Sequence, residues 1–185
     1  TPHEIHDRTM NSPIGSAFSF RASLSVAGAM VLLAASQAPA NAATYVNRVG
    51  PGGAIVNVTL GSQTWNAAGS PYIVEAHLTL AADATLAIQP GVTVQVDVNQ
   101  GIYVYGTLLA AGTTFTKLGD SGWLGIYLAT SAGASSLDGC TIAYAGNANL
   151  GYIRGADRYT AIYIDSCSPA LVNCAIQNSS NHGIE

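Results

Sequence analysis

A four-residue motif that recurs along the second half of the chain constrains the fold more than any other feature of the sequence. Its copies are Gly101-Ile102-Tyr103-Val104, Gly125-Ile126-Tyr127-Leu128, Ala161-Ile162-Tyr163-Ile164 and the shorter Gly183-Ile184-Glu185. They begin 24, 36 and 22 residues apart. Self-similarity at such a spacing is the signature of a fold built from stacked repeats.

A second repeated segment locates an interruption in this spacing. Residues 137–142 (LDGCTI) match residues 171–176 (LVNCAI) at an offset of 34. An insertion of about a dozen residues between Ile142 and Ala161 accounts for the long interval, and the glycines and asparagines of that stretch indicate a loop.

Within each copy, buried and outward positions alternate with the period of a β-strand. Gly139 and Asn173 occupy the same repeat position, and these two residue types accept a left-handed backbone most readily, so we expect a sharp corner there. Short strands joined by corners predict an all-β coil whose turns pair in parallel, about 4.8 Å apart. The isoleucines of the motif then point inward and the tyrosines outward.

Composition limits the function classes. The chain of 185 residues fits one domain, and only 9% of its residues are charged, against about 25% in ordinary soluble domains. The net charge is -4 and the few basic residues are scattered, which argues against a nucleic-acid partner.

The N-terminal segment has the features of a signal peptide. An apolar run from Leu24 to Ala35 is too short to span a bilayer, and Ala40-Asn41-Ala42 fits a signal-peptidase site. We therefore expect residues 1–42 to comprise upstream residues and a signal peptide, cleaved after Ala42, with a secreted or cell-surface product and no membrane segment afterwards. A buried helix is the alternative interpretation of this run.

Longer segments of the chain extend the pattern. They include residues 85–94 (TLAIQPGVTV), 105–108 (YGTL) and 123–126 (WLGI). With them the chain resembles bacterial exported proteins with a right-handed parallel β-helix, of the pectate-lyase-like type. This resemblance implies a right-handed coil over residues 71–185 and an N-terminal cap over residues 43–70. Because Gly183-Ile184-Glu185 starts another turn, we also expect further turns beyond it.

The outward tyrosines are the first candidate site. Tyr103, Tyr127 and Tyr163 are predicted to form one column on adjacent turns. The resemblance to polysaccharide lyases and hydrolases of this type implies that a glycan lies along the sheet that carries the column. The alternative is that the tyrosines stack only for stability.

Two carboxylates are weaker candidates for catalysis. Asp165 and Glu185 are predicted near the end of the tyrosine column, at a separation compatible with glycosidase chemistry. Outward acidic residues are also ordinary on a solvated sheet. The remaining acidic residues are isolated in sequence, so we expect no calcium site.

The inserted loop is a further candidate binding region. It gathers aromatic and charged residues, namely Tyr152, Arg154, Asp157, Arg158 and Tyr159. Guanidinium groups suit carboxylated sugars or other anionic partners. The alternative is a solvated loop held by a local pair between Asp157 and an arginine.

The three cysteines do not form a disulfide scaffold. Cys140 and Cys174 are matched across the repeat, where either a disulfide or a ladder of buried free thiols fits, and Cys167 lies near a corner. We expect no metal and no cofactor.

Together these features predict an exported β-helix scaffold that binds a polysaccharide or a cell-surface glycan, with no catalytic site evident in residues 1–185. A polysaccharide lyase or glycoside hydrolase with its active site on later turns, and a structural repeat segment of an adhesin, are the alternatives.

Overall fold

The repeated segments form the turns of a parallel β-solenoid, in which three sheets surround one apolar core. The structure is a computed structural model that describes residues 42–49 and 53–185. Its three sheets hold six, six and five strands, which corresponds to about six turns. The predicted signal peptide lies outside the described residues except for Ala42.

The sheet that carries the repeated motif is called the tyrosine sheet. Its strands are, in spatial order, β4 (Val58–Leu60), β7 (Leu78–Leu80), β10 (Gly101–Val104), β13 (Gly125–Leu128), β18 (Thr160–Ile164) and β21 (His182–Ile184). All neighbours in it are parallel.

The other two sheets complete each turn. The second sheet contains β5 (Gln63–Trp65), β8 (Thr85–Ile88), β11 (Thr107–Ala111), β14 (Ser136–Asp138) and β19 (Ala170–Val172). The third sheet contains β1 (Thr44–Tyr45), β6 (Tyr72–Val74), β9 (Thr93–Val96), β12 (Thr114–Lys117), β15 (Thr141–Ala143) and β20 (Ala175–Gln177). Two short 3-10 helices, η1 (Ala67–Gly69) and η2 (Thr130–Ala132), lie in the connections.

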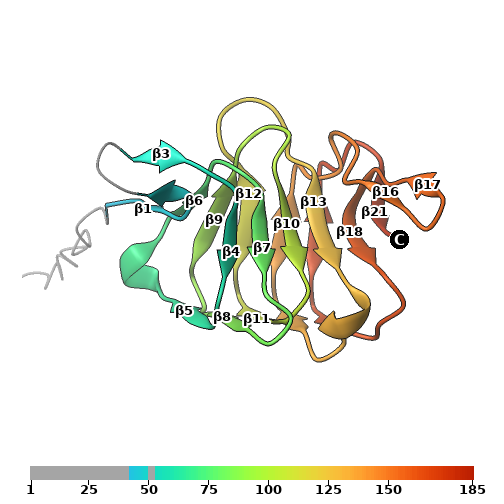
Figure 1. Ribbon diagram of the computed structural model, residues 1–185, viewed down its shortest axis with the longest axis horizontal. Helices are drawn as coiled ribbons and strands as arrows, with labels where there is room; N and C mark the ends of the chain where they lie inside the picture. The colour runs from blue at the N-terminus through green and yellow to red at the C-terminus, as the bar shows by residue number, and fades with distance from the viewer. Residues whose placement is uncertain (1–41, 50–52) are drawn as a thin grey trace, which may run out of the picture. The chain divides into compact units, whose positions relative to one another are not determined.

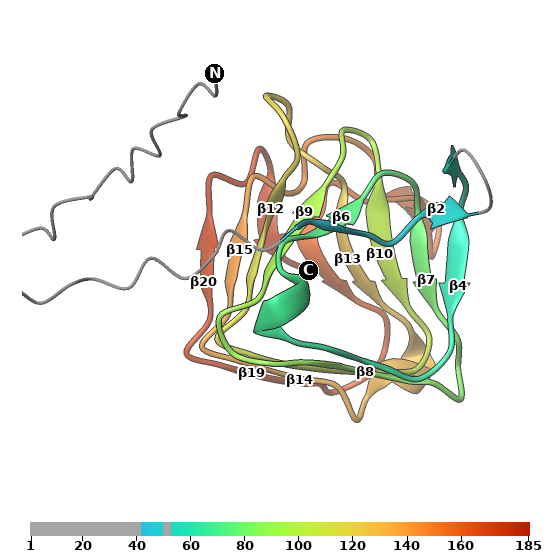
Figure 2. The same ribbon diagram turned by 90° about the vertical axis from the view of Figure 1, so that its left-hand side faces the viewer.

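The coil is right-handed, as the resemblance implies. In Figure 1 the strands of the tyrosine sheet face the viewer and run downward to the second sheet, while successive turns advance to the right. Figure 2 looks along the coil and has the tyrosine sheet on the right and the third sheet on the left. Nearly all parallel crossover connections in proteins have this hand.

The predicted register of the motif is confirmed. Ile102 pairs with Ile126, and Ile126 with Ile162, in adjacent strands. These three isoleucines are 3%, 0% and 0% exposed, whereas Ile184 on the last strand is 51% exposed. Burial of alternate positions in inner strands such as β8, β9 and β11 therefore builds the core that the period of two predicts.

The predicted corner is confirmed as well. Gly139 and Asn173 have φ angles of 62° and 52°, and Gly112 has 51° at the equivalent place one turn earlier. The amide of Gly112 donates to the carbonyl of Asp138, and the amide of Gly139 to that of Val172. The left-handed residues thus stack, and each corner bonds to the next.

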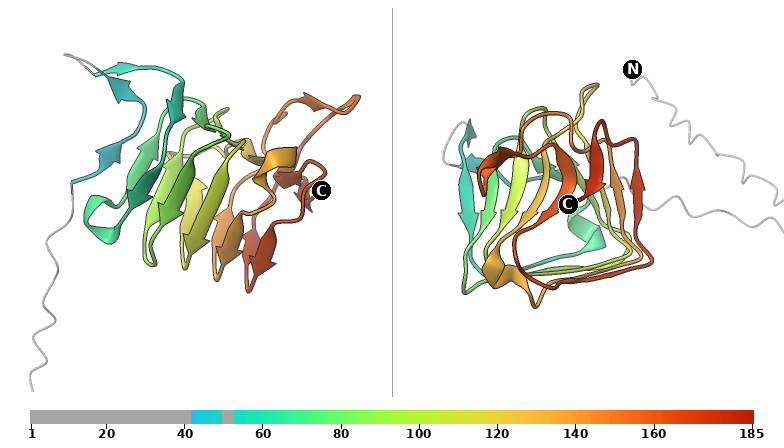
Figure 3. Two further views of the ribbon diagram at one scale, coloured as in Figure 1. Left: turned by 60° about the horizontal axis from the view of Figure 1, so that its bottom comes forward. Right: turned by 90° about the vertical axis from the view of Figure 1, so that its right-hand side faces the viewer.

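The insertion lies where the sequence places it. The chain leaves the coil after Asn147 and forms an antiparallel hairpin of β16 (Tyr152–Ile153) and β17 (Ala156–Asp157) before it returns at Thr160. Figure 3 shows this hairpin outside the three sheets. The repeat then resumes at Thr160 in β18.

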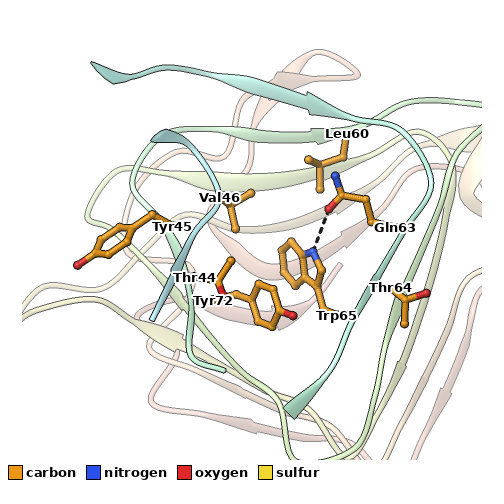
Figure 4. Close-up of a pocket in the computed structure, with 8 residues that line it drawn as sticks. All are labelled: Thr44, Tyr45, Val46, Leu60, Gln63, Thr64, Trp65 and Tyr72. Carbon is orange, nitrogen blue, oxygen red and sulfur yellow. Dashed lines mark hydrogen bonds between the residues drawn. The ribbon is translucent and has the colours of Figure 1, made fainter. Parts of the chain in front are cut away.

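Residues 43–70, the segment expected as an N-terminal cap, supply the edge strands β1, β4 and β5 of all three sheets and the short hairpin of β2 (Arg48–Val49) with β3 (Ala54–Ile55). At this end of the coil, the rings of Trp65 and Tyr72 stack at 4.4 Å, and the Trp65 indole donates to Gln63 (Figure 4). A pocket of about 300 Å³ lies beside them.

All three cysteines are free thiols. Cys140 is buried and precedes β15, while Cys174 precedes the paired strand β20, so the two occupy matching positions on adjacent turns. Burial raises the pKa of the Cys140 thiol. The thiols are therefore free, as in the expected ladder, but only Cys140 is buried, whereas Cys174 is partly exposed.

Candidate functional site

The three tyrosines of the motif form the predicted column. Tyr103 pairs with Tyr127, and Tyr127 with Tyr163. The ring centroids of Tyr103 and Tyr127 are 6.2 Å apart, and those of Tyr127 and Tyr163 are 6.1 Å apart with nearly parallel planes. Glu185 continues the column, because its amide and carbonyl bond the backbone on either side of Tyr163.

The column is only partly open to water, which corrects the expectation of an exposed aromatic strip. Tyr163 is only 6% exposed, and it packs with Leu124 and Leu150 in a small apolar cluster of its own. The hydroxyl of Tyr103 donates to the carbonyl of Leu150 at 2.9 Å, and burial raises the pKa of Tyr103. The reason is the insertion, whose residues fold back over the tyrosine sheet.

Tyr127 is fixed by a carboxylate of the next turn. Its hydroxyl donates to Oδ2 of Asp165 at 2.8 Å, and Asp165, the residue directly after β18, is diagonal to Tyr127 because it lies two residues beyond Tyr163, the partner of Tyr127. Burial, followed by the bond to the Asp165 carboxylate, raises the pKa of Tyr127. The phenol is therefore held as a neutral donor.

Arg154 reaches Asp165 from the tip of the hairpin. Arg154 and Gly155 have φ angles of 50° and 83°, the signature of the two-residue turn that suits a tight hairpin. Arginine adopts this left-handed conformation less readily than glycine or asparagine does. Its Nε donates to Oδ1 of Asp165, and this bond, followed by that of Tyr127, lowers the pKa of Asp165.

The second arginine of the loop is paired with the other candidate carboxylate. Nη1 of Arg158 donates to Oε1 of Glu185 at 2.7 Å, and its guanidinium lies 4.8 Å from the ring centre of Tyr163. Asp157 accepts a hydrogen bond from Asn149 instead of an arginine. The local pair of Asp157 with an arginine, considered above, is therefore wrong.

A pocket of about 370 Å³ lies between the tyrosine sheet and the loop, and is called the loop pocket. Its walls are Tyr103, Tyr105 and Tyr127 on the sheet side and Leu150, Tyr152 and Arg154 on the loop side. Asp165 also lines it. The volume falls in the lower part of the range of about 300–1,000 Å³ that ligand pockets span.

The loop pocket unites part of the predicted set of residues. Tyr103, Tyr127, Tyr152, Arg154 and Asp165 meet there, whereas Asp157, Arg158, Tyr159, Tyr163 and Glu185 are not among its lining residues.

Tyr105 was missed by the sequence analysis, although it lies two residues after Tyr103 and so faces the same side of the strand. It is 42% exposed, and Tyr152 is 74% exposed. These two phenols are therefore the most accessible of the pocket.

The two candidate catalytic carboxylates are both engaged with arginines. A glycosidase general acid requires a raised pKa, whereas that of Asp165 is lowered. The arrangement is suited to holding a ligand through hydrogen bonds and ring contacts, with Asp165 ionised at neutral pH.

The Asp165 carboxylate should make the stability of the fold depend on acid pH. Since its folded-state pKa lies below the ordinary value of 3.8, its contribution is present above that value and is lost as the pH falls through the lowered pKa. We expect the melting temperature of the Asp165→Asn variant to fall less steeply than that of the wild type below about pH 4.

The carboxylate of Glu75 provides the control for this comparison. Arg48 also lowers the pKa of Glu75, and this pair lies near the N-terminal end of the coil. The wild type and the Asp165→Asn variant therefore both keep the acid dependence that Glu75 causes. If the melting temperatures of the two proteins fell in parallel below about pH 4, the pairing of Asp165 with Arg154 would be contradicted.

Comparison of the chain with protein families, curated proteins and solved structures gave no match. Within residues 42–49 and 53–185, no helix has the length and apolar character that crossing a membrane requires. The same residues contain no group of three or more potential metal ligands among histidine, cysteine, aspartate and glutamate.

Proposed function

We propose that the chain is an exported β-solenoid scaffold that binds carbohydrate in the loop pocket. The observation that carries the proposal is the meeting of four tyrosine rings with a paired Arg154 and Asp165 in one hollow of about 370 Å³. Export rests on the signal-peptide pattern of residues 1–42 and on the low proportion of charged residues.

The lining of the loop pocket fits the chemistry of a sugar. A sugar ring presents C–H groups on its faces, which pack on aromatic rings, and hydroxyl groups on its rim, which both donate and accept hydrogen bonds. Tyrosine offers a ring and a hydroxyl together. Arg154 adds N–H donors and Asp165 adds acceptors within the same pocket.

The pocket is also held in place before any ligand arrives. The loop is fastened to the tyrosine sheet by the bond of Tyr103 to Leu150 and by the pair of Arg154 with Asp165. Arg158 closes the same loop, since its Nε donates to the carbonyl of Ile153. A site that is already ordered loses less conformational entropy on binding.

Binding should depend on Arg154 more strongly than the fold of the hairpin does. Asparagine accepts the left-handed φ of this turn more readily than arginine, so the Arg154→Asn variant keeps the hairpin while removing the guanidinium. We expect its affinity for a glycan, first identified on a glycan array, to fall at least about tenfold, because hydrogen bonds to charged groups contribute about 1.5–3 kcal/mol.

The exposed tyrosine Tyr152 allows a matched comparison. We expect Tyr152→Ala to weaken the same binding, measured by titration calorimetry, while Tyr45→Ala leaves it unchanged. Tyr45 is 45% exposed, but it lies on β1 at the other end of the coil. Equal affinities for wild type, Arg154→Asn and Tyr152→Ala would rule out the loop pocket as the binding site.

A further inference from the structure

The loop pocket carries no uncompensated positive charge. Among its lining residues, only Arg154 and Asp165 are ionised at neutral pH, and they are bonded to each other. The side chain of Arg154 is 55% exposed, while that of Asp165 is 11% exposed. An anionic group entering the pocket would therefore meet a cation whose charge is already balanced by a carboxylate on the same wall.

The surroundings of the pocket do not change this balance. Arg158 is paired with Glu185, and Asp157 adds a negative charge on the neighbouring strand of the hairpin. His77 packs edge-on against Tyr103 and accepts a bond from the Gly101 amide, and burial lowers its pKa. His77 is thus neutral near pH 7, and the charged groups of the region sum to a slight negative excess.

The hydrogen-bonding groups left over suit hydroxyls. Arg154 uses its Nε for Asp165, and within the described part of the chain neither the Nη groups of Arg154 nor the hydroxyls of Tyr105 and Tyr152 have a hydrogen-bond partner. The Asp165 oxygens accept one bond each here and have room for more. A hydroxyl can serve both the donors and the acceptors of this set, whereas a carboxylate can only accept.

We propose that the loop pocket takes an uncharged sugar unit and discriminates against uronic acids and other anionic sugars, a proposal that rests on the function proposed above. The role of Asp165 is then to neutralise Arg154, which remains a donor of directed hydrogen bonds without attracting anions. This reverses the expectation from the sequence, in which the loop arginines suited carboxylated sugars.

The test compares matched sugars on the whole chain. Neutral hexamers of glucose, mannose and galactose are titrated beside their counterparts oxidised to the carboxylate at C6, at low and at high salt. In any series that binds, we expect the neutral hexamer to bind at least about tenfold more tightly, with an affinity that changes little with salt.

A charge-changing variant strengthens the test. Asp165→Asn releases the Arg154 charge, so its preference should shift toward the carboxylated hexamer by about tenfold or more. Glu185→Gln is the matched control, because it releases Arg158, which does not line the pocket, and it should leave the preference unchanged.

The outcomes separate the two proposals. Tighter or equal binding of a carboxylated hexamer by the wild type would overturn the preference for uncharged sugars and leave carbohydrate binding standing. Failure of every hexamer, neutral or charged, to bind would overturn the proposed function and the preference with it.

Discussion

The substitution Ile126→Ala should lower the free energy of unfolding by about 2–5 kcal/mol, measured by denaturant titration. Ile126 is fully buried and lies between Ile102 on the preceding turn and Ile162 on the following one. Each turn of a solenoid packs only against its neighbours, so a cavity at this position weakens contacts with both. The cost includes the lost apolar transfer energy and the unfilled volume.

Ile184 offers a control at the same repeat position. It belongs to the last strand of the tyrosine sheet and is 51% exposed, so Ile184→Ala should cost less than about 1 kcal/mol. Similar losses for the two variants would mean that burial does not distinguish the two positions, contrary to the stacked arrangement.

The substitution Gly125→Ala should have a comparably large effect, about 3 kcal/mol or more, on the free energy of unfolding. Gly125 has a φ of 130°, and a Cβ atom there would lie 2.4 Å from the carbonyl oxygen of Thr160 and 2.7 Å from that of Ala161. Both obstacles are backbone atoms of the next turn, which cannot move aside without breaking the pairing of β13 with β18.

Gly119→Ala separates the two causes of this loss. Gly119 also has a positive φ, 76°, but an added Cβ would meet no atom within 4 Å. It should therefore show only the backbone cost of about 1–2 kcal/mol. If Gly125→Ala proved no more destabilising than Gly119→Ala, the close approach of the two turns would be wrong.

Much of the coil could be predicted because its signals are local and repeated. The alternation of Ile126 with Tyr127 predicts which side chain points into the core, and its recurrence at Ile162 and Tyr163 predicts the register of the two adjacent strands. Gly139 and Asn173 indicate the corner because glycine and asparagine adopt a left-handed backbone conformation more readily than other residues. None of these features depends on contacts between distant parts of the sequence.

The site was less predictable because it depends on where an irregular loop folds. The sequence placed the insertion between Ile142 and Ala161 but contained no period from which its path could be read. The cover that Leu150 provides over Tyr103, and the reach of Arg154 to Asp165, follow from tertiary packing. Consequently the prediction of the tyrosine column was correct in its register and wrong in the exposure of its side chains.

One signal within the sequence could have improved the prediction of the site. Tyr105 lies on the outward side of the chain just beyond β10, two residues from Tyr103, and the same period of two that assigned the column would have included it. A left-handed position occupied by Arg154, in contrast, becomes informative only when the φ angle is known, because a hairpin turn normally favours asparagine or glycine there.

Contacts between isoleucine methyl groups test the stacking of successive turns most directly. In a nuclear Overhauser experiment with isoleucine methyl labelling, we expect cross-peaks that join Ile126 to Ile102 and to Ile162, with none joining Ile102 to Ile162. Adjacent parallel strands lie about 4.8 Å apart, and the second neighbour is twice as far. The absence of a cross-peak from Ile126 to either isoleucine would contradict the coil.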